Sequence, residues 1–269
     1  MDHKPAKLWW KESRPWRCAA AAVIGLMGLT PLRGAQSDEA LVAVAADFAE
    51  PARVLAAAFS HESGQNVRVS VGSTGALYAQ ISHGAPFDVF LAAGDRDPKQ
   101  LVAAGLAVPE TRFTYALGSL VVWSADPARI RGDCAALLKS GEYRHVAIAN
   151  PELAPYGEAA MAALRVWGLW EGLGQKLLRA ENVGQVFQFA ATGNAELGFV
   201  ARAQVLRLSA DRAGSYCVVD PGIYPSLRQQ AVLLRHGEHN AAARLFLEFL
   251  QGANGLAIIR DFGYQAGMP

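Results

Sequence analysis

The chain has 269 residues, of which 52% are hydrophobic, and its 25 basic and 24 acidic side chains leave a formal net charge of +1. This length allows one large domain or two lobes with separate cores. The balanced charge excludes a strongly basic chain of the kind that neutralises phosphates, so we expect no nucleic-acid partner.

Residues 1–36 differ in composition from the rest of the chain. A small apolar run, 18–29, follows a stretch that carries five basic side chains, Lys4, Lys7, Lys11, Arg14 and Arg17. This order is typical of a secretory signal peptide, and the apolar run is short for a membrane span. We predict a signal peptide at 1–36 and a periplasmic protein, with a retained N-terminal anchor as the alternative.

Removal of this leader would take Cys18 with it and leave Cys134 and Cys217. Two cysteines in an exported protein can form one disulfide. Two separately buried thiols are equally compatible with the sequence. Both arrangements stay open at this point.

Apolar runs and helical patterns alternate along the remainder. We predict strands at 41–46, 66–71, 88–93, 120–123, 145–149, 197–201, 215–219 and 229–234. We predict helices at 49–61, 76–82, 98–104, 135–139, 157–166, 171–178, 185–191, 241–250 and 255–261. This alternation predicts an α/β protein with mostly parallel sheets flanked by helices.

The pattern starts anew after residue 113, and no flexible linker separates the two sets of units. We therefore predict two α/β lobes, the first from 40–116 plus 226–269 and the second from 117–225. Two extended segments, near 115–119 and near 224–228, would join them as hinge crossings.

The segment Gly72-Ser73-Thr74-Gly75 stands where a strand ends and a helix begins. The first N–H groups of a helix lack partners and carry partial positive charge, so an oxyanion can bind there without Lys or Arg. An ordinary helix cap is the alternative. Further strand-to-helix junctions follow Ala46, Asn150 and Asn182, and such junctions can converge on one cleft.

Several segments together resemble the periplasmic molybdate-binding proteins of ABC importers, over nearly all of 41–265. They are Gly72-Ser73-Thr74-Gly75, Tyr78-Ala79-Gln80-Ile81, Gly84-Ala85-Pro86, Arg112-Phe113-Thr114-Tyr115-Ala116, Asn150-Pro151, Ala154-Pro155-Tyr156-Gly157, Asn182-Val183-Gly184-Gln185, Leu197-Gly198-Phe199-Val200 and Arg228-Gln229-Gln230-Ala231-Val232. The resemblance implies a two-lobed periplasmic binding protein fold of type II. It also implies a monomer without catalysis or cofactor that captures molybdate or tungstate and delivers it to an ABC permease in the inner membrane.

The resemblance also implies a ligand site. Thr74, with Ser73 beside it, would supply a hydroxyl from the first lobe. Tyr156 and Val183 would supply backbone N–H groups from the second lobe. Ala46 falls where some relatives have Thr, and Ala201 where some have Tyr.

Asp47 falls where the family usually has Ser or Asn, and its carboxylate would repel a dianion. Either Asp47 caps its own helix and points away from the ligand, or a proton on Asp47 or on the oxyanion supplies the missing hydrogen.

Three other functions compete with this interpretation. Asp47 favours a binding protein for another oxyanion, such as phosphate. A periplasmic hydrolase would need a nucleophile and a base, for which Ser73, His83 and Asp88 are the candidates. A sensing lobe of a regulator would need a helix-turn-helix, which the leader-like N-terminus does not provide.

Overall fold

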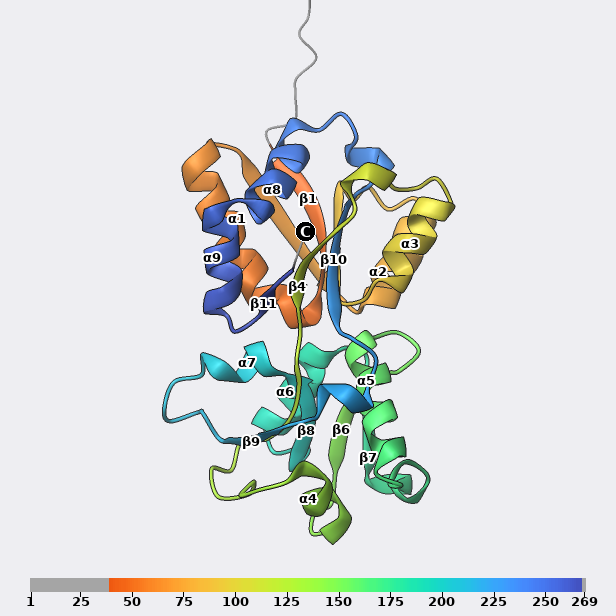
Figure 1. Cartoon of the computed structure of the whole chain (residues 1–269), viewed down its shortest axis with the longest axis vertical. Coiled ribbons are helices and arrows are strands. Elements are labelled where there is room, and N and C mark those ends of the chain that lie inside the picture. The colour runs from red at the N-terminus through yellow and green to blue at the C-terminus, as the bar shows by residue number, and fades with distance from the viewer. Residues whose placement is uncertain (1–38, 268–269) are drawn as a thin grey trace, which may run out of the picture. The chain divides into compact units, whose positions relative to one another are not determined.

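The computed structural model describes residues 39–267, so the predicted signal peptide lies outside the described residues. Two mixed sheets flanked by helices form the two lobes seen in Figure 1. The predicted two-lobed α/β fold is confirmed. None of the described helices is long and apolar enough to cross a membrane.

The first sheet has the strand order β11-β4-β10-β3-β1-β2. Its strands are β1 (Glu39–Ala45), β2 (Asn66–Gly72), β3 (Val89–Ala92), β4 (Phe113–Leu117), β10 (Arg228–Leu233) and β11 (Gln265–Ala266). Strands β2, β1 and β3 are parallel, whereas β10, β4 and β11 pair antiparallel. The sheet is therefore mixed, because β4 and β10 carry the chain out of this lobe and back.

Helices cover both faces of the first sheet (Figure 1). They are α1 (Ala49–Ser63), α2 (Thr74–Ser82), α3 (Arg96–Ala103), α8 (Ala241–Gln251) and α9 (Ala253–Asp261). Successive side chains of β1 point to opposite faces of the sheet, so Val42 and Val44 pack in one hydrophobic cluster and Ala43 packs in the other. The first cluster contains α1, α8 and α9 side chains, and the second contains α2 and α3 side chains.

The second sheet has the order β7-β6-β8-β5-β9. Its strands are β5 (Leu120–Ser124), β6 (Val146–Ala149), β7 (Leu177–Ala180), β8 (Leu197–Ala201) and β9 (Ser215–Val218). The accompanying helices are α4 (Cys134–Ser140), α5 (Pro155–Val166), α6 (Val183–Ala191) and α7 (Arg202–Leu206). Strands β7, β6 and β8 are parallel, and β5 is antiparallel to its neighbours.

The helix predicted at 171–178 is wrong. Two short 3-10 turns, Trp170–Gly172 and Gly174–Lys176, precede β7, which pairs in parallel with β6. Glycines at 172 and 174 interrupt any helix here, and Gly174 has a φ of +48°. The apolar residues that follow therefore form an edge strand.

Two chain crossings join the lobes, one between β4 and β5 and the other between β9 and β10 (Figure 1). They lie side by side, because Gly118 N donates to Leu227 O at 2.9 Å. The Tyr224 hydroxyl accepts from Leu120 N at 3.2 Å. Hinge motion therefore has to bend two segments that are bonded to each other.

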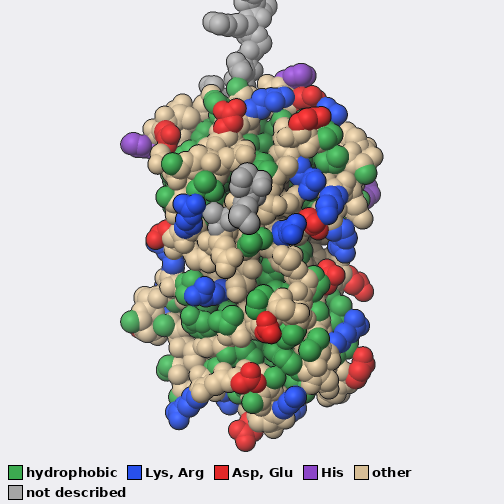
Figure 2. Space-filling view, in the orientation of Figure 1, with side chains coloured by type: hydrophobic (Ala, Val, Ile, Leu, Met, Phe, Trp, Pro, Cys, Tyr) green, Lys and Arg blue, Asp and Glu red, His purple; other side chains and the backbone are tan. Residues whose placement is uncertain are grey.

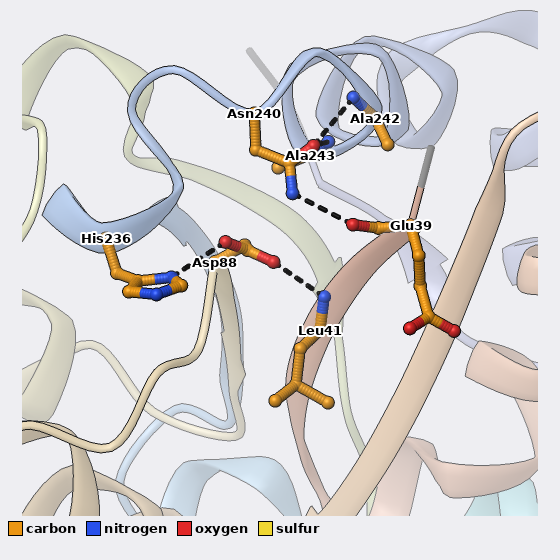
Figure 3. A network of polar contacts seen from close by, with 7 residues as sticks. All are labelled: Glu39, Leu41, Asp88, His236, Asn240, Ala242 and Ala243. Atoms are coloured by element: carbon orange, nitrogen blue, oxygen red, sulfur yellow. Dashed lines mark hydrogen bonds and ion pairs between the residues drawn. The ribbon is translucent and has the colours of Figure 1, made fainter. Parts of the chain in front are cut away.

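Asp88 fixes the outer end of the first lobe (Figure 3). Its Oδ2 accepts from Leu41 N at 2.7 Å, and its Oδ1 lies 2.9 Å from His236 Nδ1. Asn240 caps α8 and donates from its side chain to Glu39 O at 2.9 Å. These contacts join the starts of β1, β3 and α8, so Asp88 has a structural role.

Cys134 and Cys217 form a disulfide, with Cα atoms 5.7 Å apart. The bond ties the start of α4 to the edge strand β9 within the second lobe.

On the face shown in Figure 2, basic and acidic side chains are interspersed over both lobes.

Candidate functional site

The first-lobe part of the candidate site is the start of α2. Ser73 is the N-cap, and its Oγ accepts from Ala76 N at 3.4 Å. Thr74 Oγ1 accepts from Ala93 N at 3.2 Å. Both side chains are buried. A hydroxyl has one donor and two acceptor positions, so Thr74 keeps its O–H for donation to a ligand.

The second-lobe part consists of the starts of α5 and α6. Pro155 is the first residue of α5, so Tyr156 is the first residue there with a backbone N–H. Val183 is the first residue of α6, whose N-cap Asn182 accepts from Gln185 N at 3.0 Å. The N–H groups of a first helical turn have no carbonyl partner within the helix. Both junctions thus present partial positive charge without a cationic side chain.

The lobes meet at these helix starts. Gly75 N donates to Leu153 O across the cleft at 2.7 Å. Ala45 and Ala93 of the first lobe pack in the hydrophobic cluster that contains Tyr156 and Val183. The structure therefore brings the first-lobe and second-lobe candidates to one closed interface.

A groove of about 580 Å³ approaches this interface from outside. First-lobe residues Ala46, Asp47 and Glu50 form one wall, and Gly184 and Phe187 lie on the other. Asp47 is the candidate site residue that borders the groove. The other four candidates do not line the groove, and all five side chains are buried, with exposed fractions of 1–3%.

Asp47 does not cap its own helix, so that interpretation is wrong. The N-cap of α1 is Phe48, and neither α1 nor the 3-10 helix η1 (Ala46–Phe48) has a side-chain cap bond. The Tyr264 hydroxyl instead lies 3.1 Å from Asp47 Oδ2 and 3.0 Å from Asp47 O. Burial raises the pKa of Asp47 to about 7, although hydrogen bonds, with Tyr264 first among them, oppose the rise.

This raised pKa predicts how stability changes with pH. The unfolded chain has the ordinary carboxyl pKa of 3.8, so between there and about 7 the folded protein holds more protons. The Asp47 contribution to folding stability should therefore fall as the pH rises through this window, by up to about 1.4 kcal/mol per pH unit. Above the folded-state pKa the loss is complete. Urea unfolding of wild type and Asp47→Asn across this range measures the contribution as the difference between the two curves. Equal pH slopes in the two proteins would contradict it.

The hydrolase alternative needs a side-chain relay that the structure does not form. Ser73 Oγ takes part in its helix cap, and His83 Nδ1 lies 2.7 Å from Ala79 O at the end of the same helix. Asp88 is bound to His236 and to Leu41 N. Within residues 39–267, no group of three or more His, Cys, Asp or Glu side chains is placed to hold a metal ion.

The structure adds three residues that sequence reasoning did not assign to the site. Tyr264, Tyr115 and Gln229 surround Asp47 and Tyr156, and all five side chains are buried. We call these five residues the hinge cluster. Gln229 and Tyr115 lie in segments that carried the family resemblance. Tyr264 is 217 residues from Asp47 along the chain, and no local pattern signals their contact.

Two α/β lobes with two crossings, closed over helix starts, define the class of type II periplasmic binding proteins. The sequence pattern described as bacterial extracellular solute-binding protein matches residues 40–265. The chain belongs to this family.

Similar proteins confirm the resemblance to molybdate-binding proteins that the sequence showed. The molybdate-binding protein ModA of Rhodobacter capsulatus is 45% identical over 248 residues, covering 92% of this chain and 96% of the relative. ModA of Azotobacter vinelandii is 44% identical over 230 residues, covering 86% and 91%. A solved periplasmic molybdate-binding protein from Azotobacter vinelandii superposes with a TM-score of 0.81 at 37% identity, covering 85% of this chain and all of that one.

Proposed function

We propose that this protein captures molybdate or tungstate in its interlobe cleft and delivers the ion to an ABC permease. It acts in the periplasm as a monomer, without catalysis and without a cofactor. The two ModA relatives support the ligand, and the Cys134–Cys217 disulfide is in keeping with an oxidising compartment.

One observation carries the proposal: uncharged donors from both lobes come together at a buried interface. Thr74 offers a hydroxyl, and Tyr156 and Val183 offer backbone N–H groups at helix starts. Such donors bind an oxyanion through partial charges, and all of them contact it together only when the cleft is closed. Binding and closure are therefore one coupled event.

Selectivity follows from the rigidity of this arrangement. The Thr74 hydroxyl is held by Ala93 N, and the start of α6 is held by the Asn182 cap. A fixed set of donors suits the longer metal–oxygen bonds of molybdate and tungstate better than the bonds of sulfate, because it cannot contract around a smaller ion.

A thermal-shift panel of molybdate, tungstate, sulfate and phosphate tests the proposal. Molybdate and tungstate are expected to raise the unfolding temperature, since a ligand at 100 times its dissociation constant stabilises by about 2.7 kcal/mol. Sulfate at the same concentration should have little effect. No shift with any of the four ions would contradict the proposal.

Asp47 favours a second candidate, a binding protein for a protonated oxyanion such as hydrogen phosphate. Asp47 is one of the residues that line the groove, and burial raises the pKa of its carboxyl to about 7, so it repels an oxyanion less than an ordinary aspartate does. A thermal shift with phosphate that exceeds the shift with molybdate would select this candidate.

A further inference from the structure

Three buried polar atoms of the hinge cluster form no hydrogen bond of standard length, although the Tyr156 and Gln229 side chains lie near enough to Asp47 to oppose the rise that burial causes in the pKa of its carboxyl. Among the described residues these atoms are Asp47 Oδ1, Tyr156 Oη and Gln229 Nε2. The carboxyl oxygen is an acceptor, whereas the phenol and the amide nitrogen are donors. Buried polar groups cost free energy unless they pair, so three complementary atoms in one cluster require an explanation.

These three atoms come from both lobes. Asp47 and Gln229, the latter in β10, belong to the first lobe, and Tyr156 belongs to the second. The other phenols bond on the first-lobe side: Tyr264 to Asp47, and Tyr115 to Gln229 Oε1 at 3.4 Å. Tyr156 is thus the cluster member that reaches in from the opposite lobe.

The Tyr156 phenol also lies against Gly118, in the crossing between β4 and β5. A Cβ atom added to Gly118 would clash with Tyr156 Oη and lie 3.1 Å from Gln229 Nε2. The phenol therefore occupies space that only a glycine at position 118 leaves open. Burial first, and then the nearby Asp47, raise the pKa of Tyr156, so the phenol stays a neutral donor.

The backbone and the side-chain hydroxyl of Tyr156 have different roles. Its backbone N–H lies in the first turn of α5, at the proposed oxyanion site, and its hydroxyl lies in the hinge cluster. Opening the lobes would withdraw the phenol from Asp47 and Gln229 and expose all three groups to water. Contacts made only in the closed state shift the open–closed equilibrium, and the apparent affinity changes with the closed fraction.

We propose that the Tyr156 phenol, together with Asp47 and Gln229, is a polar latch that stabilises the closed lobes and so sets oxyanion affinity without contacting the ion. This inference rests on the proposed function. Tyr156 is in this respect a positioning residue, because the phenol acts on the ligand through the position of α5.

The test compares two single-oxygen deletions by stopped-flow and equilibrium titration with molybdate. Tyr156→Phe keeps the backbone N–H and removes the hydroxyl that crosses the cleft. We expect about tenfold weaker binding, through faster dissociation with an unchanged association rate. Tyr143→Phe is the matched control, because its buried hydroxyl donates to Leu138 O at 3.1 Å within the second lobe, away from the cleft. It should bind molybdate as wild type does.

A second variant leaves the phenol in place but displaces it. Gly118→Ala pushes Tyr156 Oη out of the cluster and should also speed dissociation. The latch is refuted if Tyr156→Phe and Gly118→Ala dissociate at the wild-type rate, or if Tyr143→Phe weakens binding as much as Tyr156→Phe. Failure of the wild-type protein to bind molybdate is a separate result, which refutes the proposed function itself.

Discussion

Gly75→Leu is expected to weaken oxyanion binding by about 100-fold or more while leaving the unliganded protein folded. A Cβ atom at Gly75 would lie 3.0 Å from Leu153 O and 3.1 Å from Leu153 Cα, both on the opposite lobe. A longer side chain cannot fit there once the lobes close. The loss corresponds to about 3 kcal/mol, the contribution of two or three hydrogen bonds from the second lobe.

The steric nature of this effect can be checked within the same chain. Gly75→Ala adds only the Cβ atom and should weaken binding less than Gly75→Leu. Gly172→Leu is the matched control, because nothing lies within 4 Å of a Cβ atom at that position in the second lobe. Wild-type affinity in Gly75→Leu, measured by calorimetry with molybdate, would show that closure at this contact is not required for binding.

Loss of the disulfide is expected to lower the free energy of unfolding by about 4 kcal/mol. Cys134 and Cys217 are 83 residues apart in sequence, and a crosslink over a loop of this size restricts the unfolded chain strongly. Urea unfolding of the double variant Cys134→Ala/Cys217→Ala measures the difference directly.

A reductant provides the control for this prediction. Reduced wild type should unfold at nearly the same urea concentration as the double variant, and the reductant should not change the variant. Molybdate binding should persist in the folded variant, since the bond ties α4 to β9 within the second lobe. Equal stability of wild type and double variant would contradict the prediction.

Local sequence signals located the helix starts that build the candidate site. Ser73 was readable as a cap, because its short polar side chain follows an apolar strand, and it caps α2 in the structure. The same rule failed at Asp47. Its carboxyl is held by Tyr264, a contact between residues far apart in the chain, and tertiary packing decided its direction.

Other features depended on long-range contacts that periodicity does not encode. The segment after Trp170 has an apolar pattern compatible with a helix, but pairing with β6 makes its last four residues a strand. The cysteine pairing likewise required the distance between α4 and β9. The hinge cluster combines Tyr156 of the second lobe with four first-lobe residues that are far apart in the sequence, so the folded chain was needed to see it.

Calorimetric titration of wild type and Thr74→Val with molybdate tests the central claim most directly. The substitution keeps the shape of the side chain and removes the hydroxyl at the start of α2. The wild type should bind one molybdate per chain, and the variant should bind one to two decades more weakly, the effect of losing a charge-assisted hydrogen bond of about 1.5–3 kcal/mol. Absence of binding by the wild type, or equal affinity in the two proteins, would contradict a cleft whose uncharged donors hold the oxyanion.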